Sequence, residues 1–398
     1  MQTAALAPSI PFFPYPQLFL FEQEDLTRIF RDVGQRGAFI LQQDVIRFEQ
    51  NLARFLGARQ AIGVANATDG LIIALRAAGV GSSAVSAAQH TNQGPEVIFS
   101  SHTMVATAAA IHFAGCTPVP VECGADHLID PAAVAAAITP RTVAILPTQL
   151  NGRTANMAAL WELADKHRLV IVEDAAQALG SRFQGQCAGT FGAAGAISFF
   201  PAKLLGCLGD GGAVITNDSG VAERSIALHD HGRGTDGEVT GWGLNSRLDN
   251  LQAAILDYRL AKYDQAIARR RELAAAYRER LADIAEIVLP PGPEPLDAQG
   301  NYPEHFDVYQ NYEIEADDRD ELQAYLRSHG IATLLPWGGK AVHQFAALGL
   351  RAQLPFTEKL FTRVLLLPMH VWLTESEVAT IAACITGFYR DRSAKGTR

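Results

Sequence analysis

One lysine stands out by its surroundings. Lys203 is the only lysine or arginine between Arg182 and Arg224, and it lies in the apolar stretch SFFPAKLLG. Water cannot easily solvate an ammonium group among so many apolar side chains, and loss of solvation lowers the pKa of a lysine. A neutral amine condenses with carbonyl compounds, so this lysine predicts a Schiff base with pyridoxal phosphate. A second interpretation stays open, in which the stem of Lys203 lies along the core edge and its ammonium reaches water.

A carboxylate upstream of the lysine fits the same chemistry. Asp174 ends the apolar stretch LVIVED, where an unpaired carboxylate would be costly to bury. Opposite a protonated pyridine nitrogen its charge is compensated, and the ring can then draw electrons from a carbanion. Gln177 follows closely and could donate a hydrogen bond to the 3-oxygen of the ring. The alternative is that Asp174 caps the next turn.

A third stretch could hold a phosphate. The sequence NATDG at residues 66–70 lies between an expected strand and an expected helix. Free backbone N–H groups and the helix dipole favour an anion at such a turn. The alternative is an ordinary helix cap by Thr68 or Asp69. Ser198 stands five residues before Lys203, and the glycines after the lysine let the backbone pass close to a ligand.

The elements that must position these groups alternate between strands and helices. We expect strands at 61–64, 96–100, 118–122, 142–147 and 169–174, with helices at 71–78, 106–113, 131–138 and 156–167. This order predicts a mostly parallel sheet, which binds ligands at the carboxyl ends of its strands. Thr68, Asp174 and Gln177 all fall at such ends.

The rest of the chain predicts a second, smaller α+β domain. Its elements are a strand at 309–315, a helix at 319–329, a strand at 331–335 and a helix at 375–388. One long helix over 251–281 is expected to lead into it. We therefore divide the chain into a large domain, 18–258, and a small domain, 259–398. Residues 1–17 are expected to run extended and pack on the body, and residues 24–30 and 45–56 to form helices.

Composition excludes several classes of function. The net charge of −9 argues against a nucleic-acid partner, and no apolar run approaches the roughly 18 residues of a membrane span. Five cysteines without CxxC spacing predict free thiols in the reducing cytoplasm. His229 and His231 have no further ligand cluster at fitting spacing, so we expect no metal.

Taken together, these stretches resemble a known family. NATDGLIIALRAAGVG, SHTMVATAAAI, VEDAAQALGS, SFFPAKLLGCLGDGGAVITND, HDHGRG and LNSRLDNLQAAIL follow one another as in the DegT/DnrJ/EryC1/StrS sugar aminotransferases. The resemblance spans nearly the whole chain. It implies an α/β protein of the pyridoxal-phosphate-dependent fold type I, like aspartate aminotransferase, with a large, mostly parallel sheet domain and a smaller α+β domain.

The resemblance also implies roles for single residues. Lys203 would be the catalytic residue, linked to the cofactor as a Schiff base and later moving protons. The other cofactor-binding residues would be Ala67, Thr68, Met104, Asp174, Gln177, Ser198 and Asn245. Asn245 would reach the cofactor of the partner subunit, which implies a homodimer with shared active sites. Lys340, His343 and Arg247 would contact the substrate, although Arg247 could equally be a solvated loop cation.

Three positions depart from the pattern of the family. Met104 stands where an aromatic residue usually covers the cofactor ring, so stacking should be weaker. Ala67 replaces the usual glycine of the phosphate turn; it still offers its N–H but is less permissive. Residues 82–94 form a longer insertion than usual, which could be a lid, an interface element or neither.

The activity implied is transamination for polysaccharide or antibiotic biosynthesis. L-Glutamate would give its amino group, through pyridoxal phosphate, to a keto group at C3 or C4 of a nucleotide-linked deoxysugar. One alternative is an aminocyclitol or related ring as acceptor. Another is dehydration of a keto sugar, for which the relatives have a histidine in place of Lys203. A non-catalytic binding or regulatory module is the third.

Overall fold

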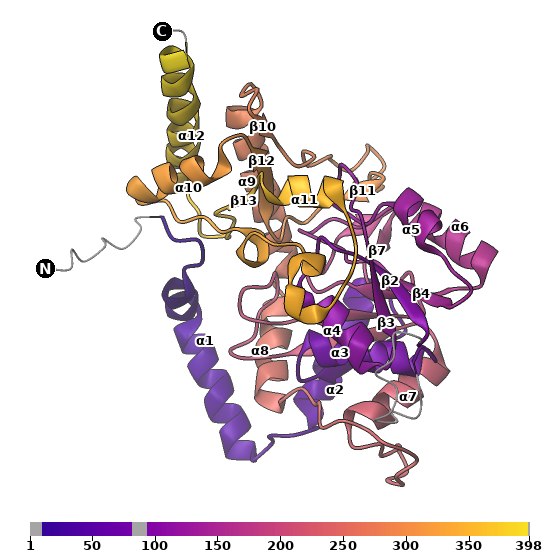
Figure 1. The fold of residues 1–398 in the computed structure, drawn as a ribbon. Coiled ribbons are helices and arrows are strands. Elements are labelled where there is room, and N and C mark those ends of the chain that lie inside the picture. Colours follow the sequence, from indigo (N-terminus) through magenta and orange to yellow (C-terminus); the bar gives the residue numbers. More distant parts are fainter. Residues whose placement is uncertain (1–9, 82–93, 397–398) are drawn as a thin grey trace, which may run out of the picture.

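A computed structural model describes residues 10–81 and 94–396, with side chains as far as Arg392. Figure 1 shows a larger part around a seven-stranded sheet and a smaller part that carries the C-terminal helix. Except for Gly94, the insertion at residues 82–94 lies outside the described residues.

The large sheet runs in one direction except for a single strand. Its order is β1-β9-β8-β5-β4-β2-β3, and only β9 is antiparallel to its neighbours. The strands are short, and three of the seven, β2, β8 and β9, are buried along their whole length, as expected when helices cover both faces. They are β1 (Gln60–Val64), β2 (Glu96–Ser100), β3 (Thr117–Val121), β4 (Thr142–Leu146), β5 (Val170–Asp174), β8 (Ala194–Ser198) and β9 (Gly212–Thr216).

Helices cover both faces of this sheet, and alternate residues of a strand therefore pack into two different cores. Val97 and Phe99 pack with one core, whereas Ile98 between them packs with another. One face is covered by α3 (Ala67–Ala77), α4 (Val105–Phe113) and α7 (Ser219–His229). The other is covered by α2 (Gln43–Leu56), α5 (Pro131–Ala137), α6 (Met157–His167) and α8 (Asn250–Leu260). Helix α1 (Tyr15–Arg36) packs on α8.

The smaller part has a core of its own. Its sheet joins β10 (Ile287–Val288), β12 (Tyr312–Ala316) and β13 (Val364–Leu367), beside α9 (Tyr263–Leu281), α10 (Arg319–Ser328) and α12 (Glu375–Gly396). Ile10 enters this core and forms a bridge with Ile331, so the described start of the chain packs on the smaller part. A third sheet has three strands of two residues each: β6 (Arg182–Phe183), β7 (Gln186–Cys187) and β11 (His305–Phe306). Helix α11 (Pro355–Phe361) precedes β13 in the smaller part.

Three sequence expectations about elements are wrong. The single helix over 251–281 is two helices, α8 and α9, separated at Ala261 and Lys262. The break lets α8 pack on the large core while α9 reaches the small one. Residues 331–335 make only isolated bridges rather than a strand. The helix expected at 24–30 lies within the longer α1, which begins at Tyr15, so residues 15–17 are helical rather than extended.

The division into two domains remains our proposal. The expected boundary at residue 258 falls in the last turn of α8, just before the helix break. Helix α9 contributes Ile267 to the large core and Leu273 and Tyr277 to the small one. The helix therefore joins the two parts rather than belonging to one.

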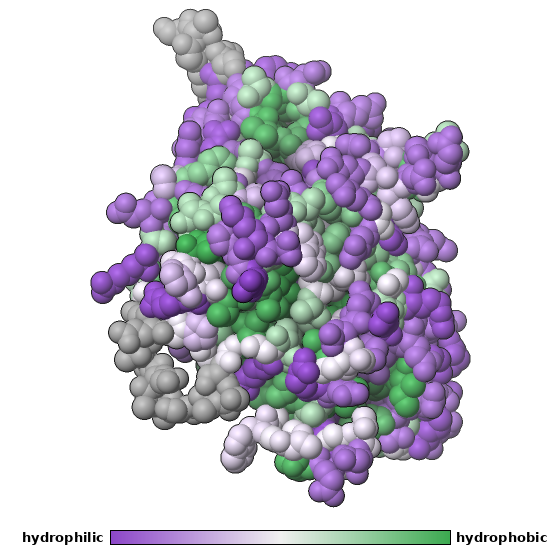
Figure 2. Space-filling model, turned by 90° about the vertical axis from the view of Figure 1, so that its right-hand side faces the viewer, coloured by the Kyte–Doolittle hydropathy of each residue, from purple (hydrophilic) through white to green (hydrophobic). Residues whose placement is uncertain are grey.

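The molecular surface carries both hydrophobic and hydrophilic areas (Figure 2). On the face drawn in Figure 2, hydrophobic residues gather in the middle of the molecule between hydrophilic ones. Among the described residues, no helix has both the length and the hydrophobicity needed to cross a bilayer. The five cysteines are free thiols, and four of them are buried. A cytoplasmic location stays a prediction.

Candidate active site

The sequence-predicted groups meet in one cavity at the carboxyl edge of the large sheet. This cavity has a volume of about 740 Å³. Because β1, β2, β5 and β8 are parallel, the residues that follow them share one edge of the sheet. Seven of the predicted residues line the cavity: Ala67, Thr68, Met104, Asp174, Gln177, Ser198 and Lys203.

Lys203 lies in the loop between β8 and β9, and a side chain of the smaller part holds this loop. The backbone N–H of Lys203 donates to the carbonyl of Phe200 at 2.8 Å. The side chain of Gln310 binds the backbone on both sides of the lysine. Its Nε2 donates to the carbonyl of Ala202 at 2.9 Å, and its Oε1 accepts from the N–H of Leu204 at 2.7 Å. Gln310 is buried, and no local pattern in the sequence indicates this contact.

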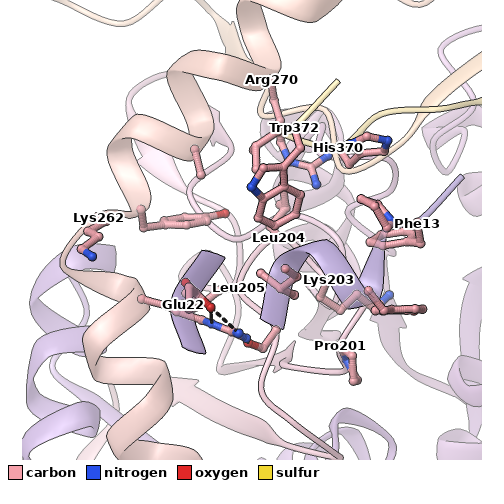
Figure 3. Close-up of a pocket in the computed structure, with 18 residues that line it drawn as sticks. Phe13, Glu22, Pro201, Lys203, Leu204, Leu205, Lys262, Arg270, His370 and Trp372 are labelled. Carbon is pink, nitrogen blue, oxygen red and sulfur yellow. Dashed lines mark hydrogen bonds and ion pairs between the residues drawn. The ribbon is translucent and has the colours of Figure 1, made fainter. Parts of the chain in front are cut away.

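The Lys203 segment separates the large cavity from a smaller one of about 150 Å³. Figure 3 shows the smaller cavity, with Phe13, Leu204 and Trp372 around the lysine segment. Burial among these groups lowers the pKa of Lys203 to about 8, although the charge of Asp174 acts in the opposite direction. A sizeable fraction of the amine is therefore neutral near physiological pH, as the sequence led us to expect.

Asp174 is the buried acid of the cavity. Only 4% of the residue is exposed, and burial raises the pKa of its carboxyl although hydrogen bonds favour the ionised form. Its Oδ2 accepts from the hydroxyl of Thr107 at 2.7 Å and its Oδ1 from the N–H of Ala176 at 3.2 Å. A cation placed in the cavity would offset the cost of burying this charge.

A row of three buried threonine hydroxyls leads to this carboxylate. Thr148 Oγ1 lies 2.9 Å from Thr103 Oγ1, which lies 2.8 Å from Thr107 Oγ1. Thr107 uses its only hydroxyl hydrogen in the hydrogen bond to Asp174. Thr103 must therefore donate a hydrogen bond to Thr107, and Thr148 must donate one to Thr103. The row polarises toward the carboxylate and fixes its orientation. Sequence reasoning missed these residues because nothing local links them to Asp174.

Gln177 is held with its amide nitrogen free. Its Oε1 accepts from the backbone N–H of Asn151 at 3.0 Å and from Asn311 Nδ2 at 3.2 Å. A backbone N–H can only donate, so this contact fixes which end of the amide is the oxygen. No described residue accepts a hydrogen bond from Nε2, which leaves that donor for a ligand in the cavity.

The turn after β1 has the form of an anion cradle. Asn66, not Thr68 or Asp69, caps helix α3, with its Oδ1 accepting from the N–H of Asp69 at 2.9 Å. Neither Ala67 nor Thr68 finds an acceptor for its N–H among the described residues. Gly212 lies so close that a Cβ there would stand 2.8 Å from the nitrogen of Ala67. Both N–H groups therefore remain for an anion.

Four predicted residues lie outside this cavity. Asn245 is exposed, and Arg247 donates from Nη1 to Oδ1 of Asp230 at 3.0 Å. Lys340 is exposed, whereas His343 is buried with Nδ1 2.7 Å from Ser101 Oγ and Nε2 3.1 Å from Glu358 Oε1. Both ring nitrogens of His343 are thus engaged within the chain. The substrate-binding roles of these residues stay predictions.

The cavity fits pyridoxal phosphate by its chemistry. It offers an amine for the aldehyde, a buried carboxylate that needs a cation, an amide donor, and free N–H groups at a helix start. Those four needs correspond to the aldehyde, ring nitrogen, 3-oxygen and phosphate of this cofactor. Met104, which is 50% exposed, supplies the expected thioether wall.

Comparison with known proteins agrees with this reading. Residues 21–386 match the model of the DegT/DnrJ/EryC1/StrS aminotransferase family. A pleiotropic regulatory protein of Geobacillus stearothermophilus is 39% identical, covering 94% of this chain and 98% of that protein. A dTDP-3-amino-3,4,6-trideoxy-alpha-D-glucose transaminase of Streptomyces venezuelae is also 39% identical, covering 84% of this chain and 83% of that protein.

Solved structures give the same result. DesV of S. venezuelae, in complex with a ketimine intermediate, superposes with a TM-score of 0.87 at 36% identity, covering 96% of this chain and 99% of DesV. NtdA of Bacillus subtilis, with bound PMP, has a TM-score of 0.83 at 27% identity, covering 97% of this chain and 87% of that one. The expected fold class, fold type I, is confirmed.

The hydroxyl row predicts the effect of removing one donor. In Thr107→Val, the Asp174 carboxylate loses its side-chain donor, so unfolding free energy should fall by about 1.5–3 kcal/mol, the value of a hydrogen bond to a charged group. Affinity for pyridoxal phosphate should fall as well. Urea unfolding and a cofactor titration measure the two effects.

The matched control is Thr154→Val, a buried threonine whose hydroxyl meets Ser181 rather than a carboxylate. It should lose stability without losing cofactor affinity. Equal cofactor affinity in the two variants would contradict the role given to Thr107.

Proposed function

The chain belongs to the DegT/DnrJ/EryC1/StrS aminotransferase family, and we propose that its substrate is a keto sugar linked to a nucleotide. It is an aminotransferase dependent on pyridoxal phosphate. The amino donor in this proposal is L-glutamate, and the acceptor is a keto group at C3 or C4 of a deoxysugar. The names of relatives that act on dTDP- and UDP-linked sugars support this substrate class.

One observation carries the proposal: Lys203 and Asp174 line the same cavity. When bound, pyridoxal phosphate supplies an electron sink that allows a C–H bond next to nitrogen to break. The negative charge of Asp174 favours a proton on the ring nitrogen. Lys203, with a pKa of about 8, can accept and return a proton near neutral pH.

The remaining residues bind and orient. The N–H groups of Ala67 and Thr68, with the hydroxyl of Ser198, would hold the phosphate. Gln177 would donate to the 3-oxygen, and Met104 would cover the ring. Gln310 and the threonine row keep the lysine and the acid in fixed positions.

The alternatives are less well supported. Dehydration of a sugar is disfavoured because Lys203 is present. A purely regulatory role, suggested by the name of one relative, would leave no use for the lysine, acid and amide that share the cavity. An aminocyclitol ketone is the remaining alternative acceptor, and a direct activity assay distinguishes it from a nucleotide sugar.

Activity should be tested with dTDP-, UDP- and GDP-linked keto sugars and an aminocyclitol ketone, each with L-glutamate. Mass spectrometry should detect an amino sugar with at least one nucleotide sugar. Product from the aminocyclitol ketone alone would overturn the proposed substrate class.

Substitution of the lysine tests its role. Lys203→Ala should lower turnover by at least about a hundredfold, because a positioned proton-transfer group contributes about 10²–10⁴-fold. After borohydride reduction, the variant should also lack the cofactor mass that the wild type keeps. Lys166→Ala, at an exposed position in α6, is the control and should behave as the wild type. A Lys203→Ala protein that kept both turnover and the bound mass would refute the assignment.

We also propose a homodimer in which Asn245 serves the partner's cavity. Asn245 is exposed and lies outside the cavity of its own chain. Trp242, in the same loop, is 94% exposed, which is unusual for so large an apolar side chain unless another surface covers it.

Mixed dimers test this proposal. Lys203→Ala and Asn245→Ala should each be nearly inactive alone. In a heterodimer of the two, one site carries both changes and the other carries none, so an equal mixture should recover about one quarter of wild-type activity. No recovery from a mixture shown by native mass spectrometry to contain heterodimers would contradict shared sites.

A further inference from the structure

Two histidines and a glutamate form a buried cluster beside the active site. His102 follows β2, His127 lies in the turn between Cys123 and Ile129, and Glu313 lies on β12 of the smaller part. The exposed fractions of their side chains are 0%, 15% and 2%. One ligand atom of each lies within 4.8 Å of those of the other two. The positions span more than 200 residues of sequence, so no local spacing could reveal the cluster.

The distances place both rings against one carboxylate. His127 Nδ1 lies 2.7 Å from Glu313 Oε1, and His102 Nε2 lies 3.4 Å from Glu313 Oε2. His102 Nε2 is fully buried and forms no hydrogen bond among the described residues. A buried nitrogen without a partner is costly unless something else satisfies it.

The second nitrogen of each ring is held in the manner of a metal ligand. His102 Nδ1 lies 3.0 Å from the carbonyl oxygen of His127, which can only accept, so Nδ1 carries the proton. In the neutral ring, the lone pair of Nε2 then faces Glu313. His127 Nε2 lies 3.3 Å from Glu315 Oε1. Metal-binding histidines commonly donate their other N–H to a carbonyl or a carboxylate in this way.

The charges of the cluster also permit a metal. Without one, a protonated His127 donates to the carboxylates of Glu313 and Glu315, and a protonated His102 lies with Nε2 3.4 Å from Glu313 Oε2. A divalent cation that displaces one proton from each ring leaves the net charge unchanged. Two imidazole nitrogens with one carboxylate form a common ligand set for zinc, which takes a fourth ligand from water or substrate.

We propose that His102, His127 and Glu313 bind one divalent transition-metal ion, with zinc as the best match. The ion would join loops of the large part to strand β12 of the smaller part. It would also brace the wall of the cofactor cavity, because Glu313 lines that cavity and His102 stands two residues before Met104. The site is independent of the transamination chemistry.

The test uses the full-length enzyme loaded with cofactor. It is incubated with zinc chloride, dialysed against metal-free buffer and measured for zinc by inductively coupled plasma mass spectrometry. One zinc per chain is expected for the wild type. Glu313→Gln should lose at least about a hundredfold in zinc affinity. The control His167→Gln, an exposed histidine in α6, should bind as the wild type does.

A graded variant separates a ligand from its support. Glu315→Gln removes the negative charge beside His127 Nε2, and with it the ion pair of Glu315 with Arg363, but leaves the three proposed ligands in place. Zinc affinity should therefore fall by about 10- to 100-fold, the range measured for the supporting partners of metal ligands. Isothermal titration calorimetry should rank zinc affinity as wild type above Glu315→Gln, and Glu315→Gln above Glu313→Gln. If the wild type keeps no more zinc than Glu313→Gln, the cluster is an ion pair of protonated histidines and the proposal is wrong.

Cobalt gives a readout that needs no variant. Co²⁺ bound by two imidazoles and a carboxylate should produce visible d–d bands, and excess zinc should abolish them. Should Glu313→Gln fail to fold, as judged by its melting curve and cofactor absorbance, the wild-type cobalt spectrum decides. The absence of these bands at saturating Co²⁺ would overturn the proposal.

Discussion

The burial of one amine and one carboxylate in a shared cavity is the constraint on which the rest of this structure depends. Burial disfavours both charges: it lowers the pKa of Lys203 to about 8 and raises the pKa of Asp174. Each group costs stability in the empty cavity, and each gains a partner when an aldehyde with a cationic ring nitrogen enters. Cofactor binding should therefore stabilise the folded protein, because it supplies the partners that the two buried groups lack.

The scaffold keeps those two groups fixed. Parallel strands bring the turn after β1, the end of β5 and the loop after β8 to one edge. Gln310 reaches from the smaller part to both sides of Lys203, and a row of three threonine hydroxyls ends with Thr107, which donates to Asp174. The hydrogen bonds of the threonine row are buried and lose little strength to solvent, whereas those of Gln310 are partly buried. The smaller part thus helps to position Lys203 as well as to line the cavity.

The sequence contained the reacting groups but not their supports. Lys203 and Asp174 could be predicted because an isolated charge in an apolar stretch is visible locally. Five of the seven strands of the large sheet followed from short apolar runs between turn residues, whereas β8 and β9 were not predicted. Gln310, Thr107 and the cluster of His102, His127 and Glu313 could not be predicted, because their partners lie far along the chain. The break between α8 and α9 was missed for a similar reason: two different cores, rather than a proline or glycine, end the helix.

The most direct test of this account is the pKa of Lys203 in the cofactor-free enzyme. Reductive labelling of the lysine by a small aldehyde, followed by peptide mass spectrometry across a pH series, reports the neutral fraction of the amine. The rate should rise about tenfold per pH unit and level off near pH 8, the pKa that burial gives this amine. A rate that still rose toward pH 10.5, the ordinary pKa of lysine, would contradict a buried amine.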